Sequence, residues 1–182
     1  MFWDKMSSFY DLFENVYNHK VYSGTGKKVA QFLGADDEVL ECACGTGAIT
    51  VSVAGKCKSI IATDFSEPML EKAVKKCKSF SNVSFEKADI TNLRFEDGAF
   101  DKVIAGNVIH LLPEPEKAFH ELERVVKPGG KIIIPTYINK SKTSAGFGVK
   151  FVEMLGLKFN QQFDLEGYKK FFAGIKFTNS CF

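Results

Sequence analysis

Apolar and polar positions along the middle of the chain predict strands that alternate with helices. Short apolar runs predict strands at residues 38–42, 59–64, 83–87, 100–106 and 131–137. Amphipathic segments between them predict helices that reach about residue 54, then span 66–79 and 114–126. This alternation predicts a doubly wound α/β fold, in which helices cover both faces of a mainly parallel sheet.

The same pattern divides the 182 residues into three parts of one domain. Residues 1–34 predict a helical cap, with helices over 4–20 and 23–33, and residues 35–137 predict the core. Residues 138–182 predict an apolar lid segment, at about 139–162, followed by a partial strand region. We expect the lid to cover a small or hydrophobic ligand, although a plain core helix would show the same pattern.

Charge and cysteine content exclude several classes of protein. The net charge of +2 is too small to hold a nucleic acid, and no apolar run is long enough for a membrane span. Five cysteines with no Cys-x-x-Cys pair fit neither a disulfide framework nor a metal site. We therefore expect free thiols, no bound metal and a cytoplasmic location.

The stretch from Val39 to Gly47 predicts a strand, a tight turn and the start of a helix. Glycines at 45 and 47 allow a ligand to approach the backbone, and the helix that follows directs free N–H groups at the turn. Such a turn suits a nucleotide or an amino-acid carboxylate, and a purely structural turn is the alternative.

Three of the first four predicted strands end close to a carboxylate, and these are Glu41, Asp64 and Asp89. In parallel sheets, ligands bind beyond the carboxyl ends of the strands. Carboxylates in an apolar setting need a partner, so we expect a ligand that carries hydroxyl groups, an amine or another cation.

Five stretches of the chain, in their order and spacing, resemble the class I S-adenosylmethionine-dependent methyltransferases. The resemblance is to their small-molecule branch of the ubiquinone/menaquinone-biosynthesis type (methyltransferase type 11), and it covers roughly residues 37–137. The stretches that carry it are VLECACGTG at 39–47, ATDFSEPML at 62–70, AD at 88–89, FDKV at 100–103 and LERVVKPGG at 122–130.

The resemblance implies S-adenosylmethionine as cofactor and S-adenosylhomocysteine as product. The cofactor-binding residues that it implies are Tyr10, Glu41, Ala43, Gly45, Thr46, Gly47, Asp64, Phe65, Met69, Asp89, Ile90, Asn107 and Val108.

In this family, the turn and Glu41 would hold the methionine part of the cofactor, and Asp64 would accept hydrogen bonds from both ribose hydroxyls. Phe65 and Met69 would lie against the adenine. Asp89 would take the adenine amino group, and the N–H of Ile90 would bond its ring nitrogen.

Two features depart from the family pattern. Ala43 stands where the family usually has glycine, which is a mild change. The family fold normally ends in a sixth strand and an antiparallel seventh, and residues 166–182 hold at most one more strand, so the C-terminal hairpin looks incomplete. An unpaired edge strand predicts a covering segment, a homodimer partner or poor solubility.

The resemblance implies methyl transfer by in-line displacement to a small, apolar or aromatic acceptor. His110 is the candidate catalytic base or substrate contact, although a local hydrogen-bonding role fits equally well. Residues 107–110 replace the Asn/Asp-Pro-Pro-Tyr/Phe signature of enzymes that methylate nucleobase amines or glutamine. The alternatives are a non-catalytic cofactor-binding protein and an NAD(P)-dependent oxidoreductase, whose fingerprint would need Gly or Ala where Thr50 stands.

Overall fold

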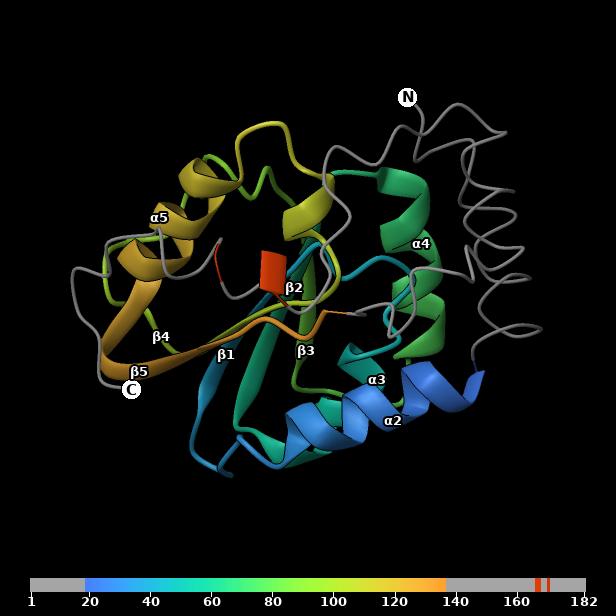
Figure 1. The fold of residues 1–182 in the computed structure, drawn as a ribbon. Helices are drawn as coiled ribbons and strands as arrows, with labels where there is room; N and C mark the ends of the chain where they lie inside the picture. Colours follow the sequence, from blue (N-terminus) through green and yellow to red (C-terminus); the bar gives the residue numbers. More distant parts are fainter. Residues whose placement is uncertain (1–18, 137–165, 168–169, 171–182) are drawn as a thin grey trace, which may run out of the picture.

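Five parallel strands form the centre of the molecule, and helices cover them (Figure 1). The computed structural model describes residues 19–136, 166–167 and 170. The strands are β1 (Glu38–Cys42), β2 (Ser59–Asp64), β3 (Val83–Lys87), β4 (Phe100–Ala105) and β5 (Val126–Ile133). They lie in the order β3-β2-β1-β4-β5 with parallel neighbours throughout, which confirms the predicted sheet.

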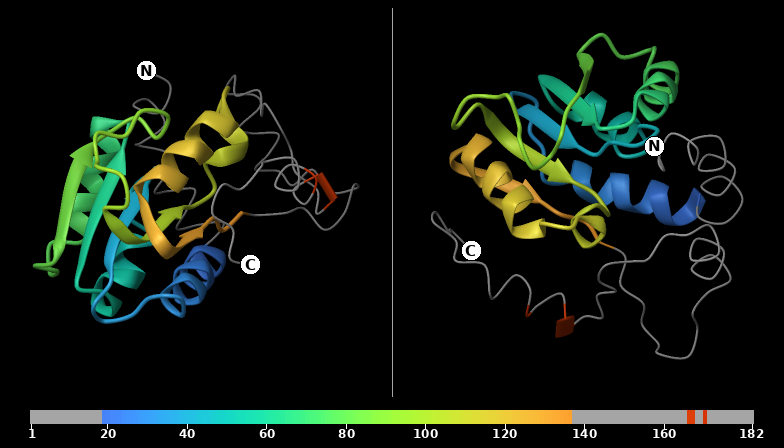
Figure 2. Two further views of the ribbon diagram at one scale, coloured as in Figure 1. Left: turned by 90° about the vertical axis from the view of Figure 1, so that its left-hand side faces the viewer. Right: turned by 90° about the horizontal axis from the view of Figure 1, so that it is seen from above.

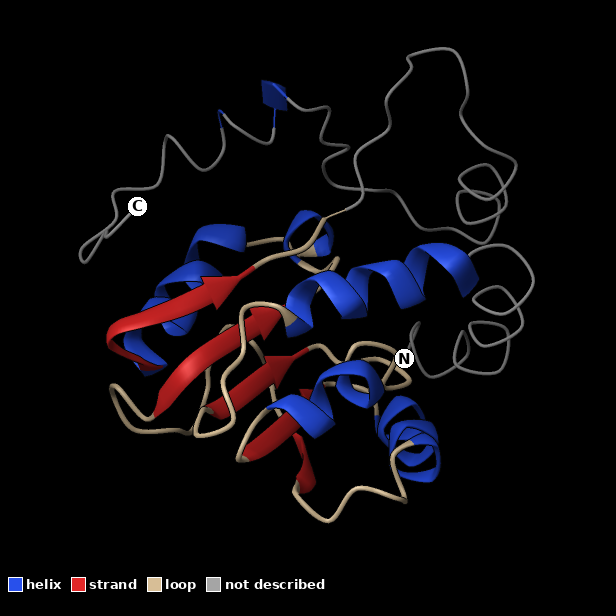
Figure 3. Cartoon of the chain, turned by 90° about the horizontal axis from the view of Figure 1, so that it is seen from below, coloured by secondary structure: helices blue, strands red, loops and turns tan. Residues whose placement is uncertain are grey.

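The helices follow the strands as the periodicity predicted. They are α2 (His19–Ala30), α3 (Thr50–Val53), α4 (Glu67–Lys76) and α5 (Pro115–Val125), with short 3-10 helices η2 (Ala54–Lys56) and η3 (Ile109–Leu111). Figure 3 shows the strands between α5 and the group α2, α3 and α4, and Figure 2 shows the same layers from two further sides.

Neighbouring residues of β1 belong to the two different faces of the sheet. Val39 packs with Val29 of α2 and Val53 of α3, whereas Leu40 packs with Leu122 of α5. All five side chains are at most 2% exposed. A strand that is buried on both faces needs apolar residues in succession, and this explains the pair Val39 and Leu40 in β1.

The order of the strands fixes where a ligand can bind. The chain moves outward from β1 to β3 and then returns to place β4 on the other side of β1. The direction of winding therefore reverses between β1 and β4, and in sheets of this kind ligands bind in the crevice beyond the carboxyl ends of the strands at the reversal. The turn after β1 lies at this edge.

Helix α2 packs closely on α3 through a glycine. A side chain at Gly26 would collide with the side chain of Ser52. Position 26 is buried, and only hydrogen at its Cα allows the two backbones to approach so closely. The contact anchors α2 against the helix that follows the turn.

Element boundaries differ from the predicted ones mainly at α2 and β5. Helix α2 already includes His19, the first described residue, and it ends at Ala30 instead of 33. Strand β5 begins at Val126 instead of 131, because residues 127–130 form an irregularity opposite Asp101 and the strand pairs on both sides of it. The Lys-Pro-Gly-Gly run lies before the predicted strand, and the structure accommodates it inside β5.

Several predictions concern residues outside the described ranges. They are the cap helix over most of 4–20, the lid segment 139–162 and the partial strand near 175–177. Among the described cysteines, Cys42, Cys44, Cys57 and Cys77 are buried free thiols, as predicted. No helix in the described part of the chain is long and apolar enough to cross a membrane.

Candidate functional site

The turn after β1 contains three residues with left-handed backbone angles. Ala43, Gly45 and Gly47 have φ values of 53°, 57° and 80°. A Cβ at Gly47 would lie 3.2 Å from Ala73 of α4, so this position requires glycine for space as well as for conformation. A Cβ at Gly45 would meet no atom of the described residues within 4 Å, so the backbone here is open to a ligand.

Asp64, the last residue of β2, is bound to the turn by backbone hydrogen bonds. Its Oδ2 accepts the N–H of Gly45 at 2.8 Å, and its Oδ1 accepts the N–H of Ser66 at 2.9 Å. Ser66 occupies the N-cap position of α4, but its side chain makes no capping hydrogen bond. The carboxylate of Asp64 therefore has a fixed direction beside the turn.

Glu41 is a buried carboxyl group directly before the turn. Its side chain is 2% exposed, and its Oε2 accepts a hydrogen bond of 2.7 Å from the Thr50 hydroxyl. Burial and the nearby charge of Asp64 raise the pKa of Glu41 to about 8, although the bond from Thr50 opposes this. A carboxyl group in this state attracts a cation that can take the place of its proton.

Asp89 lies two residues beyond the end of β3. Its Oδ1 accepts the N–H of Thr91 at 2.8 Å and the Thr91 hydroxyl at 2.7 Å, so it forms a local turn. The residue is exposed, whereas Ile90 beside it is 8% exposed and packs in the core on the α5 side. Because β3 pairs with β2 up to Asp64, Asp89 continues the same edge of the sheet.

Phe65 and Met69 have opposite exposures, although the resemblance gave both to the adenine. Phe65 is 45% exposed directly after Asp64, an unusual position for a large aromatic ring on a surface. Met69 is 3% exposed and lies within the first turns of α4. Of the two, Phe65 presents the surface on which a flat ring could stack.

The segment after β4 lies at the same edge of the sheet as the turn. Asn107 has a φ of 54°, and its N–H donates to the carbonyl oxygen of Pro135 at 2.9 Å. Val108 packs against the core on the α5 side. His110 lies in η3, and its side chain is outside the described part of the structure, as is the whole of Tyr10.

The structure thus brings together the predicted residues that follow β1 and β2, and places Asp89 and Asn107 at the same edge. Sequence reasoning missed Thr50 as the partner of Glu41. It also missed Lys76 of α4, whose Nζ donates to the Thr46 hydroxyl at 3.0 Å. Thr50 and Lys76 reach their partners only because α3 and α4 pack onto the turn.

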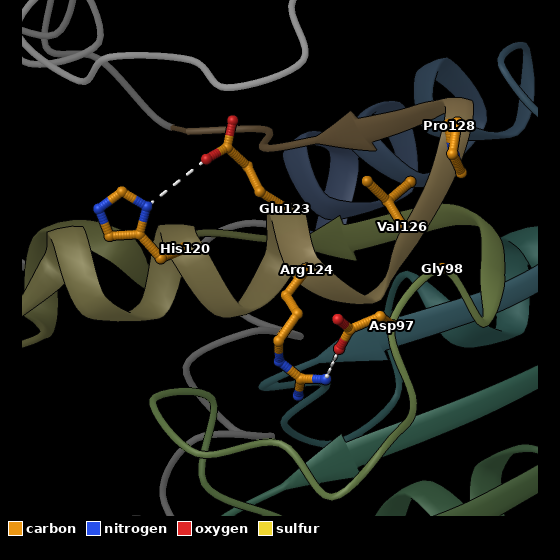
Figure 4. A pocket seen from close by; sticks show the side chains of 7 residues that line it. All are labelled: Asp97, Gly98, His120, Glu123, Arg124, Val126 and Pro128. Atoms are coloured by element: carbon orange, nitrogen blue, oxygen red, sulfur yellow. Dashed lines mark hydrogen bonds and ion pairs between the residues drawn. The ribbon is translucent and has the colours of Figure 1, made fainter.

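A pocket lies at the opposite edge of the sheet from the turn, where β4 and β5 begin (Figure 4). It encloses about 390 Å³ and is lined by Asp97, Gly98, His120, Glu123, Arg124, Val126 and Pro128. His120 points outward, and its side chain is 63% exposed. Among the described residues, no group of three or more His, Cys, Asp or Glu could hold a metal ion.

Comparison with known proteins gives the family of the chain. A family described as "Methyltransferase domain" matches residues 40–134, which contain the turn and the carboxylates of β1, β2 and the segment after β3. A demethylmenaquinone methyltransferase from Clavibacter sepedonicus is 36% identical over 135 residues, which is 72% of this chain and 54% of the relative. The chain therefore spans about half the length of that relative.

Solved structures share the fold. The YcgJ protein from Bacillus subtilis superposes with a TM-score of 0.65 at 23% identity, over 84% of this chain and 66% of that one. The trans-methyltransferase CalH, solved as a complex with SAH, gives a TM-score of 0.55 at 26% identity, over 63% of this chain and 38% of that one. Together with the match over residues 40–134, these similarities show that the chain belongs to the methyltransferase-domain family.

Proposed function

We propose that this protein transfers the methyl group of S-adenosylmethionine to a small, apolar or aromatic acceptor. The observation that carries the proposal is the buried carboxyl group of Glu41 beside a glycine turn that Asp64 orients, at the edge where the strand order reverses. A ligand that fits both carboxylates carries a cation and a pair of hydroxyl groups, and S-adenosylmethionine has both.

The described residues fit this cofactor. The open backbone at Gly45 admits the close approach of a ligand, and the fixed carboxylate of Asp64 suits a pair of ribose hydroxyls. Glu41 would face the ammonium group of the methionine part, and the exposed ring of Phe65 would stack on the adenine. Asp89 and Ile90 would bond the edge of the adenine.

The bound cofactor supplies an electrophilic methyl group on sulfur, so this chain needs to contribute binding, alignment and exclusion of water. The turn and the two carboxylates hold the donor. His110 is the candidate group to accept a proton from a neutral acceptor, since η3 directly follows the segment at the end of β4.

The acceptor class is supported by the names of relatives and by the motif after β4. A relative that is 36% identical is a demethylmenaquinone methyltransferase, a name that gives a quinone as its acceptor. Residues 107–110 lack the signature of enzymes that modify nucleobase amines or glutamine. Phenols and quinols are therefore the first acceptors to test, with amines and thiols beside them.

Calorimetry tests the donor half of the proposal. The full chain is titrated with S-adenosylmethionine, S-adenosylhomocysteine and NAD, and we expect binding of the first two only. Asp64→Ala should weaken binding, whereas Asp36→Ala, an exposed carboxylate in the loop before β1, should leave it unchanged. Binding of NAD alone, or an Asp64→Ala variant with the affinity of the parent, would contradict the proposed site.

Product formation tests the acceptor half. The protein is incubated with S-adenosylmethionine carrying a labelled methyl group and with the panel of phenols, quinols, amines and thiols. We expect label to appear in a phenol or quinol, and its appearance only in an amine or thiol would revise the acceptor class. Cofactor binding without transfer to any member of the panel would favour the non-catalytic alternative.

A further inference from the structure

The unit formed by β2 and α4 contacts each residue of the Gly45-Thr46-Gly47 turn. Asp64 accepts the N–H of Gly45 at 2.8 Å, and Ala73 sets the space available at Gly47. Between them, Lys76 Nζ donates to the Thr46 hydroxyl oxygen at 3.0 Å. The first two contacts belong to the motifs already described, whereas nothing in the family resemblance assigns a role to Lys76.

The bond between Lys76 and Thr46 joins an exposed residue to a buried one. Lys76 lies on the solvent side of α4, and its ammonium group reaches a residue that is 1% exposed. Long lysine side chains can cover apolar surface with their methylene groups while the charged end bonds elsewhere. A hydrogen bond from an ammonium group is stronger than one between neutral groups.

A simpler explanation of Lys76 is electrostatic. Cations in the last turn of a helix interact favourably with its dipole, and both Lys75 and Lys76 lie in the last turn of α4. The dipole acts on both lysines, but the structure shows a bond to the turn only for Lys76. Lys75 is therefore a control that has the same charge in the same turn of the helix and lacks the bond to Thr46.

Thr46 is the point at which such a bond has most effect. It lies between Gly45 and Gly47, which have φ values of 57° and 80° and lack side chains that would hold them in place. A turn built on two glycines loses much conformational freedom when it binds a ligand, and any contact that orders it beforehand improves affinity.

We propose that Lys76 is a positioning residue for the cofactor, which acts through Thr46 to hold the glycine turn in its binding conformation. This inference rests on the proposed function, because it names a further residue of the same site. It gives Lys76 a role in cofactor affinity and none in the chemical step. Both the charge of Lys76 and the hydroxyl of Thr46 are needed for this gain in cofactor affinity.

The test is a double-mutant cycle on the full chain, read by calorimetry with S-adenosylhomocysteine. Lys76→Met keeps the methylene stem and removes the charge, and it should weaken binding about tenfold. Thr46→Val should weaken binding similarly, and the double variant should be no weaker than either single one. Lys75→Met should bind within about twofold of the parent, as expected of a surface substitution.

Two further variants control for a folding defect at position 46 and for the role of charge at position 76. Thr46→Ala also removes the hydroxyl that accepts from Lys76, so it stands in for Thr46→Val if the buried valine prevents folding. Lys76→Arg keeps the charge and should restore at least part of the affinity lost in Lys76→Met. In steady-state kinetics, Lys76→Met should raise KM for S-adenosylmethionine and leave kcat unchanged.

Three results would overturn the inference. They are equal affinities for Lys76→Met and Lys75→Met, additive losses in the double variant, and a fall of kcat at unchanged KM. In each case the parent still binds S-adenosylhomocysteine, so the proposed function survives. A parent that does not bind this ligand refutes the proposed function itself, and the inference about Lys76 with it.

Discussion

The Thr50 hydroxyl donates a hydrogen bond of 2.7 Å to the carboxyl group of Glu41, inside the protein at the edge of the sheet. The bond partly compensates the carboxyl group for its burial, but the pKa of Glu41 still rises to about 8. At neutral pH the ligand-free protein therefore holds Glu41 mainly in the neutral form. This has consequences for stability and for binding.

Stability should fall as pH rises. The pKa of Glu41 is about 8 in the folded protein against an ordinary value of 4.5, so the folded state binds the proton more tightly than the unfolded state. Its contribution is complete below pH 4.5 and is lost between there and pH 8, at up to about 1.4 kcal/mol per pH unit. Chemical denaturation across this range measures the slope, and Glu41→Gln should lack this component.

Cofactor binding at pH 7 should release a proton, because the ammonium group of the ligand favours the ionised form of Glu41. The binding enthalpy of S-adenosylmethionine should then differ between phosphate and Tris buffers, whose enthalpies of protonation differ. Glu41→Gln provides the control, since its amide cannot ionise. An equal buffer dependence in this variant would mean that the proton comes from another group.

Ala43→Gly should stabilise the protein. Ala43 has a φ of 53°, which is unfavourable for any residue with a Cβ, and glycine removes this strain. We expect a gain of about 0.5–1 kcal/mol in the free energy of unfolding, after allowance for the greater freedom of glycine in the unfolded chain. Ala118→Gly in the middle of α5 is the control and should lose about 1 kcal/mol or more. A loss in both variants would show that Ala43 is not strained.

Arg124→Lys should destabilise the protein without affecting the cofactor. The guanidinium group donates to both carboxylate oxygens of Glu121, to Asp97, and to the carbonyl oxygens of Phe95 and Leu93, and it holds the pKa of Glu121 below its usual range. Lysine cannot make this set of bonds. We expect a loss of about 1–3 kcal/mol in denaturant unfolding, because the carbonyl groups lose their donors.

Arg94→Lys is the matched control for this substitution. Arg94 is exposed in the connection between β3 and β4, the segment that Arg124 bonds, and its replacement should change stability by less than about 0.5 kcal/mol. Affinity for S-adenosylhomocysteine should be equal in both variants, because Arg124 lies at the edge of the sheet opposite the glycine turn (Figure 4). A large loss of affinity in Arg124→Lys alone would contradict this expectation and show that Arg124 influences cofactor binding from the opposite edge of the sheet.

His110→Ala should reduce kcat if His110 accepts a proton from the acceptor. A general base of this kind contributes about 10²–10⁴-fold to the rate, and the loss should be smaller at high pH, where the acceptor ionises by itself. His120→Ala is the control, because this exposed histidine of α5 contacts Glu123 and not the crevice. Equal activity of both variants at all pH values would leave His110 without a catalytic role.

The sequence was sufficient for the features that depend on local pattern. Apolar periodicity predicted all five strands, and parallel order alone placed Glu41 and Asp64 at one edge, where the structure has them. The turn at Gly45 and Gly47 was predicted by glycine itself, because few other residues accept its backbone angles.

Contacts that depend on how a helix is rotated could not be predicted. Three lysines lie on α4, at positions 72, 75 and 76, and nothing in their spacing selects Lys76 as the partner of Thr46. Thr50 is likewise one of several small polar residues near the turn. The irregularity at 127–130 escaped prediction because proline and glycine usually end a strand, whereas here they bulge out of one.

The glycine contact between α2 and α3 also limits how the protein can be engineered. Replacing glycine by alanine is a common way to raise helix propensity, and α2 contains two candidates, Gly24 and Gly26. Alanine at 24 would meet no described atom within 4 Å, so it should be accepted with a gain of about 1 kcal/mol. The same change at 26 would force α2 away from Ser52 and loosen the support of the ligand-binding turn.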